Sequence, residues 1–304
     1  MRDWLLDSDP SIRWQVLGDP AERKRIATEG WGAQLLALRG EDGFWAGGAL
    51  FPANWKFDRN EGQPWIATEP TLTMLQLMGV DPDAQTVRET IAAVRDNCRW
   101  EHAGQAFFAG EVEPCINGRA VALGAYFGEN VDGIVTRLVA EQLEDGGWNC
   151  EAENGSVRSS FDTTINVLEG LLLYERAGGA VDVVEARRRG DEYLLERRLF
   201  RRKSTGEVVK PSYLEFSFPN RWHYDVLRGL DYFREAGGPP DPRMDEAIEH
   251  VRSKRQPDGR WLLENTHRGK VYFQLEDGDG RPSRWNTLRA LRVLSWYEGR
   301  PAAT

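Results

Sequence analysis

The sequence has few cysteines and no long apolar run. Its 304 residues include three cysteines, an odd number that does not build a disulfide framework in a chain of this length. A membrane-spanning helix needs about 18 consecutive apolar residues, and no run approaches that length. The N-terminus, Met1-Arg2-Asp3-Trp4, lacks the apolar segment of a secretory signal. These absences predict a cytoplasmic protein with no transmembrane segment.

Concentrated positive charge is also missing. The net charge is −9, and the two densest basic clusters, Arg187-Arg188-Arg189 and Arg201-Arg202-Lys203, lie among acidic neighbours. A nucleic-acid-binding surface needs a basic patch, so no nucleic-acid partner is expected. Glycine-rich phosphate-binding motifs and the Gly-x-Ser-x-Gly elbow of hydrolases are absent as well.

Helical periodicity is present throughout, whereas the alternation typical of strands is nearly absent. Val87, Ile91, Val94 and Cys98, for example, are spaced to share one face of a helix. With 40% hydrophobic residues and 12 tryptophans, the chain has enough apolar surface for a large core. We predict an all-α protein.

The predicted helices are of two kinds that alternate along the chain. Amphipathic, charged segments cover 21–38, 83–98, 131–143, 181–200 and 241–256. More uniformly apolar segments cover 11–17, 68–78, 116–127, 161–176, 221–235 and 284–297. A helix that is apolar around most of its girth must be buried on most sides. We therefore expect a single domain over residues 1–304, an α/α toroid in which about six helical hairpins form a ring with inner and outer layers.

A short phrase is repeated three times after predicted outer helices. It reads Asp42-Gly43-Phe44-Trp45, then Asp145-Gly146-Gly147-Trp148, then Asp258-Gly259-Arg260-Trp261. Gln142 and Gln256 precede two of the copies. The phrase resembles the glutamine–tryptophan repeats of the squalene–hopene cyclase and protein prenyltransferase superfamily. This resemblance implies an α/α toroid that binds a terpenoid or another apolar molecule in its central cavity.

The catalytic motifs of that superfamily are not matched. Class II terpene cyclases carry an Asp-x-Asp-Asp-Thr-Ala stretch, and the corresponding residues here are Ser159-Ser160-Phe161-Asp162-Thr163-Thr164. Phe161 stands where the cyclase has its acid, and the Asp-x-Cys of the prenyltransferase zinc site is missing. The resemblance thus implies the scaffold and an apolar ligand, with different chemistry.

Polar residues gather where the predicted inner helices begin. In a toroid these helix starts lie at one end of the ring, beside the long loops, and we expect the functional site there. The candidate catalytic residues are Glu113, Asp162, His223 and Asp225. Carboxylates and histidine across a cavity can act as general acid and base. The alternative is that these carboxylates only stabilise helix N-termini.

A metal site is the sharpest chemical prediction. Cys115, Cys150 and His223 open three successive units of the ring, and two thiolates with one imidazole suit catalytic zinc. Glu113, Asp225 or His267 could complete the site. Two alternatives stay open. The cysteines could be buried apolar residues beside a core histidine, or they could form a disulfide.

Aromatic and arginine side chains supply the candidates for ligand binding. They are Trp148, Arg158, Phe161, Arg221, Trp222, Tyr224, Arg284 and Trp285. Aromatic rings would line an apolar cavity, and arginines would bind a phosphate or carboxylate group. The alternative is packing between repeats. The polar segment 264–270 is a candidate lid over the cavity.

The predicted function is an enzyme that binds a largely apolar small molecule in the central cavity, with zinc as the candidate cofactor. One alternative is a carbohydrate-active lyase or hydrolase, which requires opposed carboxylates in a wet cleft. The other is a non-catalytic ligand-binding or interaction module that kept the repeats and lost the cyclase acid. The Phe161 substitution favours this last alternative.

Overall fold

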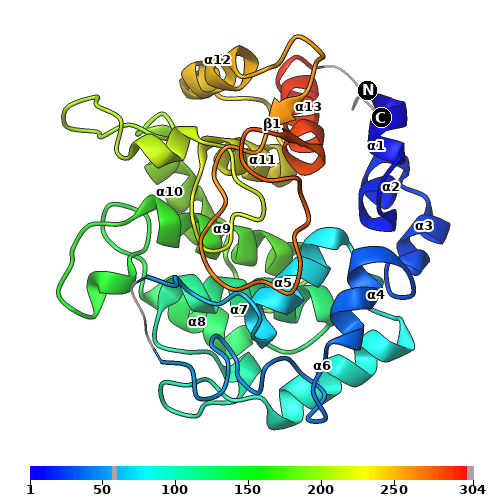
Figure 1. Cartoon of the computed structure of the whole chain (residues 1–304). Coiled ribbons are helices and arrows are strands. Elements are labelled where there is room, and N and C mark those ends of the chain that lie inside the picture. The colour runs from blue at the N-terminus through cyan, green and yellow to red at the C-terminus, as the bar shows by residue number, and fades with distance from the viewer. Residues whose placement is uncertain (57–59, 300–304) are drawn as a thin grey trace.

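The chain is all-α, as predicted. The computed structural model describes residues 1–56 and 60–299 (Figure 1). Six helices form a central group: α2 (Pro10–Leu17), α5 (Thr68–Met78), α7 (Pro114–Phe127), α9 (Phe161–Arg176), α11 (Val226–Ala236) and α13 (Arg284–Tyr297). The others are α1 (Arg2–Leu6), α3 (Pro20–Arg25), α4 (Gly30–Ala37), α6 (Gln85–Asn97), α8 (Asp132–Ala140), α10 (Val184–Leu195) and α12 (Asp245–Ser253).

Short elements complete the described part of the chain. They are the 3-10 turns η1 (Phe107–Ala109), η2 (Cys150–Ala152), η3 (Pro211–Leu214) and η4 (Pro242–Met244), and the paired strands β1 (Trp261–Leu262) and β2 (Pro282–Ser283). Within residues 1–56 and 60–299, no helix is both long and apolar enough to cross a bilayer.

Contacts among the six central helices close a circle. Each contacts the next in chain order, from α2 through α5, α7, α9 and α11 to α13, and α13 contacts α2. Outside this ring, α3 packs on α2, α8 on α7, α10 on α9 and α12 on α11. Figure 1 shows α6, α8, α10 and α12 at the periphery. The ring helices are the predicted apolar segments, and the peripheral helices are the charged ones.

One predicted segment is broken into two helices, and another becomes helical five residues late. Segment 21–38 is broken into α3 and α4, because Gly30 has a left-handed φ of 65° at the start of α4. Segment 221–235 becomes helical only at Val226, where the Asp225 side chain accepts a hydrogen bond from the backbone N–H of Arg228. Residues 222–224 therefore lie in the preceding loop rather than in the ring helix.

The repeated tryptophan phrase connects an outer helix to the next ring helix. The indole Nε1 of Trp45, Trp148 and Trp261 donates to the carbonyl ten residues earlier, at 2.8, 2.7 and 2.7 Å. Their backbone N–H groups donate to the hydroxyls of Thr68, Thr164 and Thr287 in α5, α9 and α13. All three tryptophans are fully buried. Each copy thus satisfies a carbonyl of the outer helix and also pins the ring helix that follows.

The two glutamines before the phrase behave differently. Gln142 donates to the carbonyl of Ala186 in α10, which ties two neighbouring outer helices together. Gln256 donates to Lys254, within its own turn.

Two glycines allow α7 and α9 to approach closely. A Cβ on Gly118 would lie 2.5 Å from the carbonyl oxygen of Asn166, and one on Gly170 would lie 2.2 Å from that of Gly118. Since no Cβ fits, backbone packs directly on backbone. The α7–α9 pair is therefore a rigid part of the ring.

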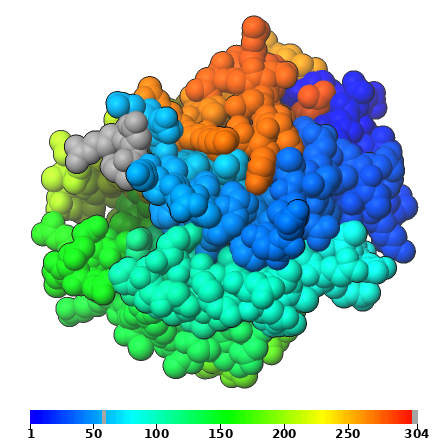
Figure 2. Space-filling model, turned by 60° about the horizontal axis from the view of Figure 1, so that its bottom comes forward, coloured from blue at the N-terminus to red at the C-terminus, as the bar shows by residue number. Residues whose placement is uncertain are grey.

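A long segment between β1 and α13, residues 263–281, covers one end of the ring; we call it the cap segment. It is the orange loop in Figure 1, and Figure 2 shows its atoms packed against the blue N-terminal third. Trp65 donates from its backbone N–H to Lys270 and from its indole to Arg268. The hydroxyl of Tyr272 donates to the carbonyl of Ile66, just before α5.

Candidate functional site

A cavity of about 330 Å³ lies inside the ring, and all six ring helices contribute side chains to it. This volume is within the range of small-molecule sites. Leu77, Arg176 and Glu235, near the C-terminal ends of α5, α9 and α11, line the cavity and are partly exposed to solvent. The cavity therefore opens at that end, whereas the sequence analysis placed the functional end at the helix N-termini.

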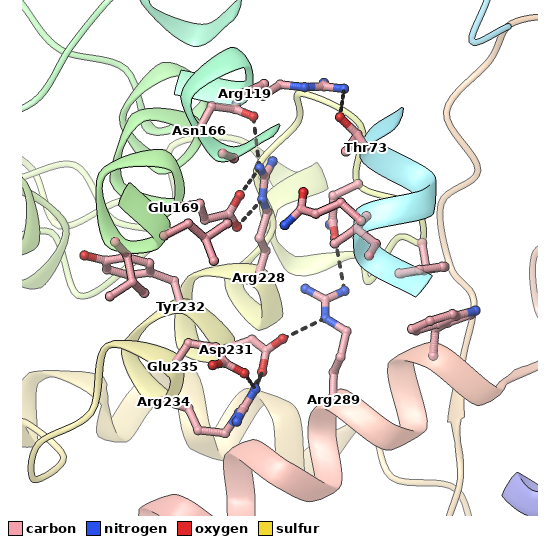
Figure 3. A pocket seen from close by; sticks show the side chains of 18 of the residues that line it. Thr73, Arg119, Asn166, Glu169, Arg228, Asp231, Tyr232, Arg234, Glu235 and Arg289 are labelled. Atoms are coloured by element: carbon pink, nitrogen blue, oxygen red, sulfur yellow. Dashed lines mark hydrogen bonds and ion pairs between the residues drawn. The ribbon is translucent and has the colours of Figure 1, made fainter. Parts of the chain in front are cut away.

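Arginine dominates the charge of the cavity (Figure 3). Its lining includes seven arginines: Arg119, Arg176, Arg221, Arg228, Arg234, Arg289 and Arg292. The lining carboxylates are Glu169, Asp231 and Glu235. The cavity lining thus carries more guanidinium groups than carboxylates.

Arg228 has a complete set of partners. It makes a bidentate ion pair with Glu169 of α9 at 2.9 and 2.6 Å and donates to the Asn166 amide oxygen at 2.9 Å. It also donates to the carbonyl of His223 at 2.7 Å. Its charge is therefore neutralised within the ring. The pairing joins α9 to α11.

Asp231 is shared by two arginines. Arg234 lies 2.8 Å away and Arg289 3.3 Å away. Burial raises the pKa of this carboxyl, but the two guanidinium groups outweigh burial and hold the pKa below its usual range. Asp231 is therefore ionised and paired at neutral pH, and it is not a candidate general acid.

None of the described carboxylates forms an ion pair with Arg221. Among the described residues, its guanidinium makes no hydrogen bond or ion pair and lies 5.2 Å from the centre of the Trp65 ring. Burial and the charge of Arg119 lower the pKa of Arg221 to about 9, although the charge of Glu69 raises it, so Arg221 is a poorly compensated cation at neutral pH. Its side chain lines the central cavity and also a smaller one, of about 70 Å³, under the cap segment. The backbone φ of Arg221 is 55°, in the left-handed region.

Arg292 is the second arginine of the cavity that forms no ion pair with a described carboxylate. It donates to the side-chain oxygen of Gln15 at 2.8 Å and to the carbonyl of the same residue. Burial and nearby Arg234 lower its pKa. This contact also joins α13 to α2, where the ring closes.

Apolar side chains occupy the rest of the wall. Phe218 and Trp285 stack with ring centres 4.4 Å apart, and both line the cavity. The Trp285 Nε1 is buried without a hydrogen-bond partner in the described part of the chain. Leu172, Leu173 and Leu288 extend the apolar surface. The cavity thus has an aromatic and aliphatic wall beside its arginines.

Two of the eight predicted ligand-binding residues, Arg221 and Trp285, line this cavity. Trp148 is buried in its repeat turn, and Phe161 packs among Tyr193, Tyr213 and Tyr224. Trp222 lies in the loop before α11. Arg284 donates to the carbonyls of Trp4 and Asp7. Arg158 is exposed.

The predicted catalytic aspartates are both saturated with partners. Asp162 accepts from Lys210 at 2.7 Å, from the hydroxyl of Tyr213 at 3.0 Å and from the backbone of Tyr224. Asp225 accepts from Ser217, Asn220 and the N-terminus of α11. Neither side chain lines the central cavity. Their catalytic roles stay predictions, since these contacts also account for the aspartates structurally.

His223 lies in an aromatic stack under the cap segment. Its ring stacks on Trp222 with centres 3.6 Å apart and on His267 with centres 3.9 Å apart. Burial, together with nearby positive charge, lowers the pKa of His223 to about 3 and that of His267 to about 4. Both rings are therefore neutral at physiological pH. The segment proposed as a lid is held over the ring by this stack.

The predicted metal ligands separate into two places. Cys115, in the first turn of α7, and Cys150, in η2, lie with their sulfurs 2.8 Å apart. Glu113 joins them, with its carboxylate 3.6 Å from the Cys115 sulfur, and the three ligand atoms lie within 4.8 Å of one another. His223 is not part of this group. The Cys150 hydrogen bond and burial raise the pKa of the Cys115 thiol.

The sequence analysis missed most of the cavity arginines. The sequence did contain a usable signal, which is a stripe of polar residues at helical spacing within each of two otherwise apolar segments. The stripes are Asn166, Glu169 and Arg176 in α9, and Arg228, Asp231 and Glu235 in α11. A polar stripe on a buried helix must face a cavity or a partner.

Comparisons with known proteins give a distant structural similarity. No family model matches the chain, and no curated protein matches it in sequence. A solved structure of the type II terpene cyclase MstE from Scytonema, a variant without ligand, aligns over 94% of this chain and 83% of its own, with 14% identity and a TM-score of 0.42. Another MstE variant, in complex with its substrate geranylgeranyl dihydroxybenzoate, aligns over 97% and 86% with the same identity and TM-score. Similarity this low assigns neither a family nor a function to the chain.

Proposed function

We propose that the chain is an α/α toroid whose central cavity binds a small molecule with an apolar body and an anionic group. The observation that carries this proposal is Arg221, a poorly compensated guanidinium that lines the cavity. Burying an unpaired charge costs several kcal/mol, and structures keep such a charge where a ligand neutralises it.

The position of the arginines supports an anionic ligand. Arg228 lies in the first turn of α11, where the helix dipole is already positive, and Arg221 lies five residues before that helix. Cations there are unfavourable unless an anion is close. Glu69 pairs with Arg119, and Glu169 pairs with Arg228, which leaves Arg221 for an exogenous group.

The apolar wall supports the second half of the proposal. Phe218, Trp285, Leu172 and Leu288 face the same cavity as Arg221. An inorganic anion would leave this wall in contact with water, whereas a prenyl or acyl chain would cover it. The proposed ligand therefore differs from the largely apolar one expected from the sequence, because it also carries an anionic group. Prenyl diphosphates and long-chain carboxylates both have this composition.

The carbohydrate-active alternative has less support. It needs a carboxylic acid and a carboxylate facing each other across the cavity. Glu169 and Asp231 line the cavity, but arginines pair with both. The proposal is therefore a binding function, and it assigns no reaction.

Calorimetric titration of the untagged protein tests the proposal. The probes are farnesyl diphosphate, dodecanoate, farnesol and inorganic diphosphate. We expect one of the two amphiphilic anions to bind more tightly than farnesol and than inorganic diphosphate. Replacing Arg221 with glutamine should weaken that binding roughly 10- to 100-fold, the value of hydrogen bonds to a charged group.

Two measurements keep this test specific. Arg158→Gln, which removes an exposed arginine outside the cavity, should bind as the wild type does. Arg221→Gln should be at least as stable as the wild type without ligand, since it removes a poorly compensated charge. Equal affinity for farnesol and farnesyl diphosphate, unchanged by Arg221→Gln, would overturn the proposal, as would no binding of any probe.

A further inference from the structure

Cys115, Cys150 and Glu113 form a compact group of ligand atoms outside the central cavity. Two cysteine sulfurs 2.8 Å apart lie closer than nonbonded heavy atoms usually do. Sulfurs this close are positioned to form a disulfide or to bind a common ion. The carboxylate of Glu113 is 3.6 Å from the Cys115 sulfur, within reach of the same ion.

The ring holds this group in place. Glu113 and Cys115 flank Pro114 at the first turn of α7, and Cys150 lies in η2, before α9. The α7–α9 contact through Gly118 and Gly170 fixes the starts of these two helices relative to each other. A site built on rigid elements is preorganised, so the ligands need not be assembled on binding.

The loop that carries Cys150 is also fixed by hydrogen bonds. The Thr163 hydroxyl lies 3.4 Å from the Cys150 sulfur and 3.4 Å from its backbone nitrogen. The Asn149 side chain accepts from Glu151 and donates to the carbonyl of Arg158. A hydroxyl beside a ligand sulfur orients that sulfur, as outer-shell groups do around metal ions.

We propose that Glu113, Cys115 and Cys150 bind one divalent zinc ion, with water in the fourth position. Thiolates select soft and borderline metals, and a carboxylate beside them is compatible with zinc rather than with cuprous copper. Glu113 is exposed, which leaves a side of the group open to water. His223, the third ligand expected from the sequence, is replaced by Glu113.

The geometry needs a small adjustment to accept the ion. Two zinc–sulfur bonds of about 2.3 Å at a tetrahedral angle place the sulfurs about 3.8 Å apart. The sulfurs would therefore separate by about 1 Å when the ion binds. The site is independent of the anion-binding cavity, because none of its three ligands lines that cavity.

The test is the zinc content of untagged protein grown with zinc and purified with reductant and without chelators. We expect about one zinc per chain in the wild type and a strong loss in Cys115→Ser and in Cys150→Ser. Cys98→Ala is the matched control, because Cys98 is the remaining cysteine, is fully buried and lies outside the group. This variant should keep its zinc.

Cobalt substitution uses the wild-type protein, so its result holds even if the cysteine variants fail to fold. Tetrahedral cobalt with two thiolate ligands should show intense visible bands and sulfur-to-metal charge transfer, and Glu113→Gln should weaken cobalt binding at least 10-fold. A reduced wild type that contains no zinc and takes up neither zinc nor cobalt would overturn the proposal. So would a Cys115–Cys150 disulfide in protein purified without reductant, if the reduced protein also bound no metal.

Discussion

Gly170 in α9 lies directly against the carbonyl of Gly118 in α7, and there is no room between them for a side chain. Replacing Gly170 with alanine would place a Cβ 2.2 Å from that oxygen. Since the obstruction is backbone, the two helices must move apart. We expect Gly170→Ala to lower the free energy of unfolding by about 1–3 kcal/mol, measured by urea denaturation. Gly133→Ala in α8 is the control, because a Cβ at that position would meet no atom within 4 Å and the change should be neutral or stabilising.

The repeated tryptophan turn predicts a second stability effect. The Thr164 hydroxyl accepts from the buried backbone N–H of Trp148 at 3.1 Å. Thr164→Val keeps the shape of the side chain and leaves that N–H without a partner. The free energy of unfolding should fall by about 1–3 kcal/mol. Thr287→Val should behave alike in the third repeat, and Thr136→Val, at an exposed site on α8, should change stability much less. A cost at Thr136 equal to that at Thr164 would contradict this role for the repeat.

Asp191 should make stability depend on pH. Burial raises the pKa of this carboxyl to about 6, against the hydrogen bond from Tyr232 and the charge of Arg187, which lower it. The folded state therefore binds a proton that the unfolded state releases between pH 3.8 and about 6, and stability falls as the pH rises through this window. Above pH 6, Asp191→Asn should be more stable than the wild type by less than about 3 kcal/mol. The advantage should disappear near pH 4.

Denaturation of both proteins between pH 4 and 8 checks this expectation. Asp83→Asn, at an exposed site, should leave the pH profile of the wild type unchanged. A constant difference between Asp191→Asn and the wild type at every pH would show that the effect is not ionisation.

The histidine stack should make the protein sensitive to acid. The pKa values of His223 and His267 are about 3 and 4 in the folded state, below the ordinary value of 6.5. The unfolded chain binds these protons first, so stability is lost as the pH falls below 6.5. At pH 5 the loss is at most about 2 kcal/mol for each residue. His267→Phe keeps a ring in the stack and should reduce the loss of stability between pH 7 and 5.

The exposed His102 supplies the control for this measurement. His102→Gln should lose as much stability as the wild type between pH 7 and pH 5. An identical loss in His267→Phe would mean that other groups cause the acid sensitivity.

The sequence by itself determined the helices and their order. The segments 68–78, 161–176 and 284–297 match α5, α9 and α13, because helical period and turn residues act over a few positions. The repeated Asp-Gly-x-Trp phrase was also visible, since each copy acts mainly within its own turn and the adjoining helices. The limits of α11 were wrong, because the Asp225 cap lies after His223 and Tyr224, inside an apolar segment that looks continuous.

Tertiary structure alone decided the charge of the cavity, its open end and the partners of each arginine. Glu169 and Arg228 lie 59 positions apart, and Glu69 and Arg119 lie 50 apart. Helical period indicates which residues share a face, but it does not indicate what that face meets across a ring. Helical period likewise does not show that Arg221 is poorly compensated, or that Cys115 lies beside Cys150 rather than beside His223. Contacts between distant segments depend on how the helices pack, which no local pattern encodes.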